Sequence, residues 1–404
     1  MRSRKARLGI AACTAALAAA LTTPASAEPR DIHEELEAIR RGYDIPSLAA
    51  AVSRNGELLA AGAAGHYSME HAIHVDTESK YHLGSCSKAM TAVVVASMVE
   101  EGLIDWDMTL PEALPELVDF INPALHGSTI RDLAAHRSGI AETRDGDLRM
   151  IPWTQLATIA DQPISVQRAE LAKTALSVMP SADPGEEFWY SNFGYILLGL
   201  IAEANAGQSF EDLLAERVFE PLEMTSAGFG PPGTPVADGD ADPDEPVGHI
   251  YRDEWLPQRV IEGRPAPDNP VVFNSAGRVH ASITDWARFV DDLQRGLNGE
   301  GVLLDAETYA LLFEDPENDG YTLGWAVGEA DWAGGTIYNH AGSNRLWFAQ
   351  ASIAPERNLS LVVATNAASA DAQKALDEAI AQLVDMYTFT PEMLEAISSP
   401  ADEK

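Results

Sequence analysis

The sequence SCSK at residues 85–88 lies between a loop-like segment, residues 81–84, and a long apolar run, residues 89–99. This arrangement predicts a buried helix that begins near Ser85. Residues three apart on a helix share a face, with Cβ atoms about 5–6 Å apart, so Lys88 can reach the Ser85 hydroxyl. A serine hydroxyl is a poor nucleophile at neutral pH and needs a base beside it. Burial of the ammonium against the apolar helix would lower its pKa and let it accept that proton.

Composition limits the partners that this chain can have. It has 404 residues, of which 46% are hydrophobic and 22% are charged, as in an ordinary globular protein. The formal net charge is −35 at pH 7, and the acidic residues are spread along the chain. Such a charge disfavours binding to nucleic acid and to anionic membrane surfaces. We therefore expect a small-molecule or short-peptide substrate, and the sequence leaves the oligomeric state open.

The first 27 residues predict a signal peptide. Four basic residues precede an apolar stretch at residues 8–21, and ASA at residues 25–27 is typical of a cleavage site. We expect the protein to be secreted or periplasmic after cleavage, with lipid modification of Cys13 as the alternative. No other run of 18 apolar residues occurs, so the mature chain is expected to have no stable membrane span.

Apolar runs that predict strands lie at both ends of the mature chain. Near the N-terminus, two short runs flank Asn55-Gly56, a dipeptide that strongly favours a β-hairpin. Near the C-terminus, four runs separated by short turns predict an antiparallel meander, at residues 321–327, 336–340, 346–353 and 359–365. Helical patterns occupy residues 34–41, 195–206, 210–219, 284–297 and 369–386.

These patterns predict an α/β fold, in which an antiparallel sheet takes strands from both chain ends and carries flanking helices. We expect one catalytic domain at residues 28–395. Its α/β part covers residues 28–84 and 275–390, and residues 85–274 form an inserted helical part. Residues 230–270 are rich in Pro, Gly and Asp and lack periodicity, which indicates a long surface loop.

A second motif, Tyr190-Ser191-Asn192, precedes the helical pattern at residues 195–206. A tyrosine can relay a proton if a nearby cation lowers its pKa. An asparagine offers both a donor and an acceptor to a substrate amide. Taken alone, these residues are better explained as a helix N-cap with a packed tyrosine.

A third motif, His340-Ala341-Gly342-Ser343, lies at the end of a predicted strand. A glycine at Gly342 would let a ligand approach the backbone closely. The backbone N–H of Ser343 could then pair with that of Ser85 as an oxyanion hole. Taken alone, the motif also fits an ordinary boundary between a strand and a turn.

Together, the three motifs resemble those of the penicillin-recognising serine hydrolases, in particular the branch of class C β-lactamases, DD-peptidases and related esterases. Two further stretches are similar to the same family, TIRDLAAHRSG at residues 129–139 and AGRV at residues 276–279. The resemblance covers roughly residues 30 to 390. It implies the β-lactamase/transpeptidase-like form of the α/β fold predicted above.

The resemblance also implies the catalytic roles. Ser85 would be the acylated nucleophile, Lys88 its base partner, and Tyr190 the group that passes the proton to the leaving group. The substrate would be held by five further residues, Asn192, His340, Gly342, Ser343 and Asn344. Cys86 is the competing nucleophile, but a cysteine on a buried helix usually behaves as a small hydrophobic residue. No metal-ligand spacing or nucleotide-binding loop occurs, so no metal and no cofactor are expected.

This chain departs from class C β-lactamases at the third motif, where His340 stands in place of their lysine. A histidine is mostly neutral at pH 7 and attracts a substrate carboxylate less strongly. Asn344 or Arg345 could supply that contact instead. We therefore expect an exported serine hydrolase acting on D-alanyl-type peptides, amides or β-lactam-like substrates. The alternatives are an esterase for short acyl esters, a β-lactamase, and a non-catalytic protein that binds peptidoglycan peptides.

Overall fold

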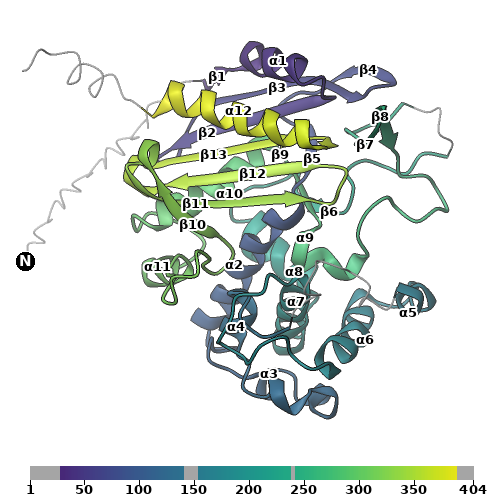
Figure 1. The fold of residues 1–404 in the computed structure, drawn as a ribbon, viewed down its shortest axis with the longest axis vertical. Helices are drawn as coiled ribbons and strands as arrows, with labels where there is room; N and C mark the ends of the chain where they lie inside the picture. Colours follow the sequence, from purple (N-terminus) through teal and green to yellow (C-terminus); the bar gives the residue numbers. More distant parts are fainter. Residues whose placement is uncertain (1–27, 141–152, 238–241, 389–404) are drawn as a thin grey trace, which may run out of the picture.

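The molecule has two halves, a mixed sheet with its covering helices in the upper half and a helical region in the lower half (Figure 1). The computed structural model describes residues 28–140, 153–237 and 242–388. The expected signal peptide, residues 1–27, therefore lies outside the described residues. Among the residues described, no helix is both long and apolar enough to cross a membrane.

The large sheet is assembled from both ends of the chain, as predicted. Its strand order is β1-β3-β2-β13-β12-β11-β10, with β4 paired to β3. The N-terminal strands are β1 (Arg30–Asp31), β2 (Ser47–Arg54), β3 (Glu57–Ser68) and β4 (His71–His74). The C-terminal strands are β10 (Ala326–Ala330), β11 (Gly335–Ser343), β12 (Phe348–Ala354) and β13 (Leu359–Thr365). The predicted fold class is thus confirmed.

The two halves of the sheet meet where β2 pairs with β13 in antiparallel register, from Arg54 opposite Leu359 to Ala49 opposite Ala364. The predicted hairpin joins β2 to β3. Its two turn residues, Asn55 and Gly56, both have positive φ angles of 51° and 82°. A two-residue turn of this kind matches the right-handed twist of the flanking strands.

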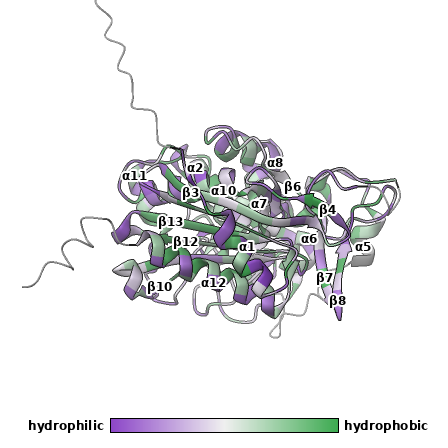
Figure 2. Ribbon diagram, turned by 90° about the horizontal axis from the view of Figure 1, so that it is seen from above, coloured by the Kyte–Doolittle hydropathy of each residue, from purple (hydrophilic) through white to green (hydrophobic). Residues whose placement is uncertain are grey.

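Both faces of the sheet are covered by helices. On one face, α1 (His33–Gly42) and α12 (Ala370–Tyr387) pack on β3, β2 and β13, and on the other lies α10 (Ile283–Gly296). Small side chains along β2 alternate between two apolar cores, with Ala49 and Ala51 in one and Ala50 and Val52 in the other. Apolar residues accordingly colour the central strands β12 and β13 (Figure 2). This alternation is the period of two expected for a sheet buried on both faces.

The helical region is built around α2 (Ser87–Glu100), the helix predicted from the apolar run after Lys88. Residues 87–98 of α2 are all buried, which explains why the helix is apolar on every side. Its neighbours include α7 (Asn192–Ala206), α8 (Phe210–Leu214), α9 (Asn274–Gly277) and α11 (Ala306–Leu312). The remaining helices are α3 (Leu110–Ala113), α4 (Ile130–Ala134), α5 (Trp153–Thr158) and α6 (Ile164–Ser177).

The expectation of a long surface loop at residues 230–270 is wrong in part. A hairpin of β7 (Gly248–Arg252) and β8 (Glu254–Gln258) occupies its centre, and β7 also pairs with β14 (Ala367–Ala368). The sequence signal was weak because the turn at Asp253, with φ of 64°, is a single residue without glycine. A further small sheet consists of β5 (Lys80–His82), β9 (Val279–Ser282) and β6 (Gly228–Phe229).

The first strand of the predicted meander is displaced. Residues 321–325 form a turn, in which the Thr322 N–H donates to the Trp325 carbonyl at 2.7 Å, and the strand begins only at Ala326. Gly324, with φ of 102°, fits closely against Ala89 of α2, where a Cβ atom would come within 3.0 Å of backbone. The turn brings Tyr321 inward, and this proves important for the site.

Candidate active site

Ser85 lies in a single 3₁₀ turn, Gly84–Cys86, that leads directly into α2. Gly84 has a positive φ of 51°, which a side chain would disfavour. The Ser87 hydroxyl fixes the turn, because it donates to the Gly84 carbonyl at 2.7 Å and accepts from the Val279 N–H at 3.0 Å. Ser85 is left partly exposed at the start of a buried helix.

Lys88 lies one turn further along α2 and is fully buried. Its Nζ lies 3.2 Å from Ser85 Oγ, 2.6 Å from Asn192 Oδ1 and 2.6 Å from the Ala276 carbonyl oxygen. The last two are pure acceptors and take two N–H groups, whereas a hydroxyl can donate as well as accept. Asn192 and the Ala276 carbonyl therefore orient Nζ towards the Ser85 hydroxyl, which is the geometry of a general base once the amine is neutral.

The second motif lies at the start of α7 and faces Lys88. Ser191 is the N-cap of α7 and accepts from the Gly194 N–H at 3.2 Å. The cap directs Asn192 towards Lys88 and leaves the Tyr190 side chain 40% exposed beside it. The Lys88 Nζ lies 4.9 Å from the centre of the Tyr190 ring. Ser191 thus forms the expected N-cap, and Tyr190 and Asn192 lie close enough to Lys88 for the proposed functional roles.

A ring cluster that the sequence did not indicate supports Tyr190. His136 is buried at its centre, with ring centroids 4.3 Å from Tyr190 and 4.8 Å from Tyr321. Its Nδ1 accepts from the Ser191 N–H at 3.1 Å, so the hydrogen of the neutral ring is on Nε2. Burial, and then the nearby Lys88, lower the pKa of His136 well below its ordinary value.

His340, the histidine of the third motif, is held neutral in β11. Burial and then the charge of Lys88 lower its pKa to about 3. Its Nδ1 lies 2.9 Å from the Ala341 carbonyl oxygen and its Nε2 lies 3.2 Å from the Tyr321 hydroxyl. Because a carbonyl can only accept, Nδ1 donates and Nε2 accepts from Tyr321. His340 therefore reaches Tyr190 through Tyr321 and His136.

The end of β11 packs directly on the turn that carries the nucleophile. A Cβ atom on Gly342 would lie 2.7 Å from the Ser85 backbone nitrogen, and one on Gly84 would lie 2.3 Å from the Ser343 backbone nitrogen. The two amides proposed for the oxyanion hole are thus neighbours, and two glycines make that approach possible. β10 pairs with β11 only as far as Asn339, so residues 340–343 extend beyond the end of β10.

Asn344 and Cys86 are engaged in contacts of their own. The Asn344 amide donates to Asp268 at 2.9 Å, and its oxygen accepts from the Leu346 N–H at 3.1 Å. Cys86 points into the core, with its Sγ 3.5 Å from the His340 carbonyl oxygen, and burial raises the pKa of its thiol. Arg345 is exposed at the turn after β11. Ser85, rather than Cys86, faces Lys88.

An open cavity of about 370 Å³ adjoins this constellation. It is lined by uncharged side chains only, counting the neutral His340: Tyr190, Tyr321, Ala326, Asn339, His340, Ala341 and Gln350. No cluster of three or more potential metal-ligating His, Cys, Asp or Glu side chains occurs within residues 28–140, 153–237 and 242–388. The cavity can therefore receive an uncharged group beside Tyr190.

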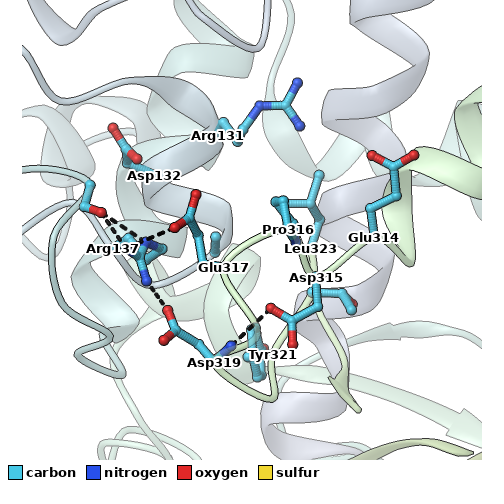
Figure 3. Close-up of a pocket in the computed structure, with 13 residues that line it drawn as sticks. Arg131, Asp132, Arg137, Glu314, Asp315, Pro316, Glu317, Asp319, Tyr321 and Leu323 are labelled. Atoms are coloured by element: carbon cyan, nitrogen blue, oxygen red, sulfur yellow. Dashed lines mark hydrogen bonds and ion pairs between the residues drawn. The ribbon is translucent and has the colours of Figure 1, made fainter. Parts of the chain in front are cut away.

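Tyr321 also lines a second, smaller cavity of about 130 Å³ on its other side (Figure 3). There Arg137 pairs with Asp319 and with Glu317, and its Nε donates to the Gly185 carbonyl at 3.1 Å. These bonds join the segment that carries Tyr321 to the segments that carry His136 and Tyr190. Arg137 thus stabilises the wall of the larger cavity.

Sequence reasoning missed Tyr321, His136 and the Ala276 carbonyl. His136 was given no role of its own, and Tyr321 was assigned to a strand. The stretches around His136 and Ala276 were both noted as similar to the family, and that similarity was the one signal that could have revealed them.

This chain is similar to known proteins over most of its length. The chain matches the family model described as Beta-lactamase over residues 31–385. It is 26% identical over 347 residues to penicillin-binding protein 4 of Amycolatopsis lactamdurans. The aligned region covers 82% of this chain and 84% of that protein.

Solved structures show the same fold. A D-stereospecific amidohydrolase from Streptomyces sp. has a TM-score of 0.63 at 23% identity, over 86% of this chain and 96% of that one. A D-amino acid amidase from Ochrobactrum anthropi SV3, complexed with L-phenylalanine amide, has a TM-score of 0.65 at 17% identity, over 87% and 98% of the two chains.

Proposed function

Because this chain belongs to the β-lactamase family, we propose that it is a serine hydrolase that acts on D-alanyl-type peptides and amides through an acyl-enzyme at Ser85. The observation that carries the proposal is the position of the buried Lys88 Nζ, 3.2 Å from Ser85 Oγ, with two carbonyl acceptors on its other side. A binding protein without catalysis would not need this buried lysine. Burying an amine is costly unless its partners satisfy it.

The proposed reaction starts with attack of Ser85 Oγ on the substrate carbonyl carbon, while its proton moves to Lys88 Nζ. The resulting oxyanion accepts hydrogen bonds from the Ser85 and Ser343 N–H groups. Tyr190, beside Lys88, passes the proton to the leaving nitrogen, and the C–N bond breaks to leave an acyl ester on Ser85. Water then attacks the ester, gives its proton to the same base, and releases the acid with Ser85 restored.

The cavity favours a leaving group or side chain without charge. Its lining has no lysine or arginine, and the pKa of about 3 keeps His340 neutral at any physiological pH. A free substrate carboxylate would find no cation in this lining. Amides and internal peptide bonds therefore fit better than substrates recognised by a terminal carboxylate. The amidase names of two structural neighbours support the same substrate class.

An esterase for short acyl esters is the second candidate, because the same uncharged cavity would accept a small alkyl ester. A β-lactamase is less favoured, since β-lactams carry a carboxylate that the neutral His340 attracts weakly. Export also remains a proposal, supported by the signal-peptide pattern of residues 1–27. N-terminal sequencing of the protein recovered outside the producing cell would test this proposal, and we expect the mature chain to begin at Glu28.

Turnover by the mature chain would be compared on D-alanine p-nitroanilide, its L-isomer, p-nitrophenyl butyrate and nitrocefin, with labelling by a fluorescent penicillin. We expect preferential turnover of the D-anilide, and loss of at least about 10³-fold in Ser85→Ala. Cys86→Ala, which removes the adjacent buried thiol, should retain activity. Dominant butyrate turnover would favour the esterase. Absence of both labelling and turnover, or undiminished turnover in Ser85→Ala, would refute the acyl-enzyme.

A further inference from the structure

Asp268 is a buried carboxylate that lies behind the active site. It comes from the end of the segment expected to be a surface loop, yet its side chain has 0% exposure. Its Oδ2 accepts from Arg278 Nε at 2.8 Å and from His82 Nε2 at 3.2 Å, and its Oδ1 accepts from Asn344 Nδ2 at 2.9 Å. Three separate segments thus converge on one carboxylate.

Two of these partners, His82 and Asn344, connect Asp268 to the two residues whose N–H groups form the proposed oxyanion hole. His82 accepts the Gly84 N–H on Nδ1 at 3.1 Å, and Gly84 immediately precedes Ser85. This bond places the His82 hydrogen on Nε2, where it points to Asp268. Asn344 immediately follows Ser343. Each N–H of the oxyanion hole therefore has a neighbour in sequence that is linked to Asp268. Gly84, before Ser85, is linked through His82, and Asn344, after Ser343, is bonded to Asp268 directly.

The third partner leads to the base. Arg278 donates from Nη1 to Asn274 Oδ1 at 2.7 Å, so it is fixed within the segment that contains Ala276. The Ala276 carbonyl accepts from Lys88 Nζ at 2.6 Å. A shift of Asp268 would therefore also be transmitted to the acceptor that orients Lys88.

Asp268 is charged in this environment. Burial by itself raises the pKa of a carboxyl group, but the hydrogen bond from His82, and then Arg278 and Asn344, lower the pKa of Asp268 well below its ordinary value. The carboxylate is also inaccessible to a substrate. Its contribution to the reaction must therefore act through the residues that it holds.

We propose that Asp268 is a positioning residue that sets the separation of the Ser85 and Ser343 N–H groups, and so the fit of the oxyanion hole to the transition state. This inference rests on the proposed acyl transfer at Ser85. An oxyanion hole acts on charge that develops in the transition state, so its misalignment lowers kcat more than it changes KM. Misplacement of reacting groups by about 1 Å can cost about 100-fold in rate.

The test compares Asp268→Asn with Asp292→Asn in the mature chain. Asp292 is also a buried carboxylate, but it accepts from Tyr309 and from the Val302 N–H, on α10. We expect Asp268→Asn to lower kcat on the preferred amide by about 10- to 100-fold with KM within threefold. Affinity for an acylaminomethyl boronic acid, whose oxygen occupies the oxyanion hole, should fall in parallel. Asp292→Asn should lower thermal stability while leaving kcat and boronate affinity within twofold.

The proposal is overturned if folded Asp268→Asn keeps kcat within twofold of the wild type, or loses no more than Asp292→Asn. If Asp268→Asn does not fold, His82→Ala decides by the same two measurements, because it removes one link and leaves the Asp268–Arg278 pair intact. If the boronate does not inhibit the wild type and Ser85→Ala keeps its turnover, the proposed function itself has failed, and this inference with it.

Discussion

His340 has no hydrogen-bonding nitrogen left for a substrate. Its Nδ1 donates to the Ala341 carbonyl and its Nε2 accepts from Tyr321. The resemblance to the family implied that this residue would help to hold the substrate. Its contacts indicate instead that it holds Tyr321 in place.

Gly342 gives the sharpest test at the level of one residue. Replacement by alanine would put a Cβ atom 2.0 Å from the Leu83 carbonyl oxygen and 2.7 Å from the Ser85 nitrogen. The turn must then move away from β11, and the oxyanion hole opens. We expect Gly342→Ala to lower kcat/KM by about 100-fold or more, measured on the preferred amide. Gly328→Ala, in the neighbouring β10, meets no atom within 4 Å and serves as the control. Equal activity of the two variants would contradict the arrangement.

Local geometry predicted only partners that are close along the chain, whereas the distant Tyr190, Asn192 and His340 were predicted from the resemblance to the family. Ser85 and Lys88 are three residues apart, and helical geometry alone brings them together. His82 and Asp268 are 186 residues apart, and no local pattern links them. Tyr321 and His136 are hidden for the same reason, since both reach the site only through tertiary packing.

At the scale of secondary structure, the start of α7 connects stability to chemistry. Ser191 caps the helix through the Gly194 N–H and donates its own N–H to His136. The next residue, Asn192, binds Lys88. Fraying of this first turn would therefore displace both Asn192 and the base.

We expect Ser191→Ala to lower the free energy of unfolding by about 1 kcal/mol, because an N-cap hydroxyl is lost. It should also lower kcat, since the turn that carries Asn192 loosens. The matched control is Ser209→Ala, which removes the cap of α8, where Ser209 accepts from the Asp212 N–H at 3.1 Å. That variant should show a similar loss in urea denaturation with unchanged kcat. A normal kcat in Ser191→Ala would show that the cap does not hold Asn192 in place.

Elements with a strong period or a clear stop signal were predicted to within a few residues. α12 follows its Ser369 cap, α7 ends at Gly207 with φ of 69°, and β13 occupies residues 359–365 as expected. The hairpin of β7 and β8 escaped prediction because its strands are short and contain Pro257. Its stability comes from pairing with β14, more than 100 residues away in sequence.

For the whole molecule, buried and half-buried histidines with lowered pKa values make the fold sensitive to acid. Burial lowers the pKa of His249 and of His280 to about 4 and that of His340 to about 3, and it lowers the pKa of His136 well below normal. Between pH 6.5 and 4 the unfolded chain binds protons that the folded chain does not, so unfolding is favoured as the pH falls. Asp291, whose pKa burial raises to about 6, opposes this trend in part.

We expect the free energy of unfolding, measured by urea denaturation, to decrease steadily from pH 7 to pH 4. Each histidine that is protonated in the unfolded chain but not in the folded chain lowers the free energy of unfolding by up to about 1.4 kcal/mol per pH unit. His280→Gln removes one such group and should flatten the curve. A stability that is constant over this range, or that rises towards pH 4, would disprove the assignment.

The pairing of β2 with β13 has a consequence for the order of assembly. The Thr365 hydroxyl donates to the Ser47 carbonyl across 318 residues of chain. During synthesis at about 5–20 residues per second, β2 would wait about 15–60 s for the strand beside it. Throughout that interval, the edge of β2 that later pairs with β13 has no native partner. Contacts between residues so far apart in sequence form slowly even in the finished chain. Newly made protein is therefore most exposed to aggregation and proteolysis before its last strands emerge.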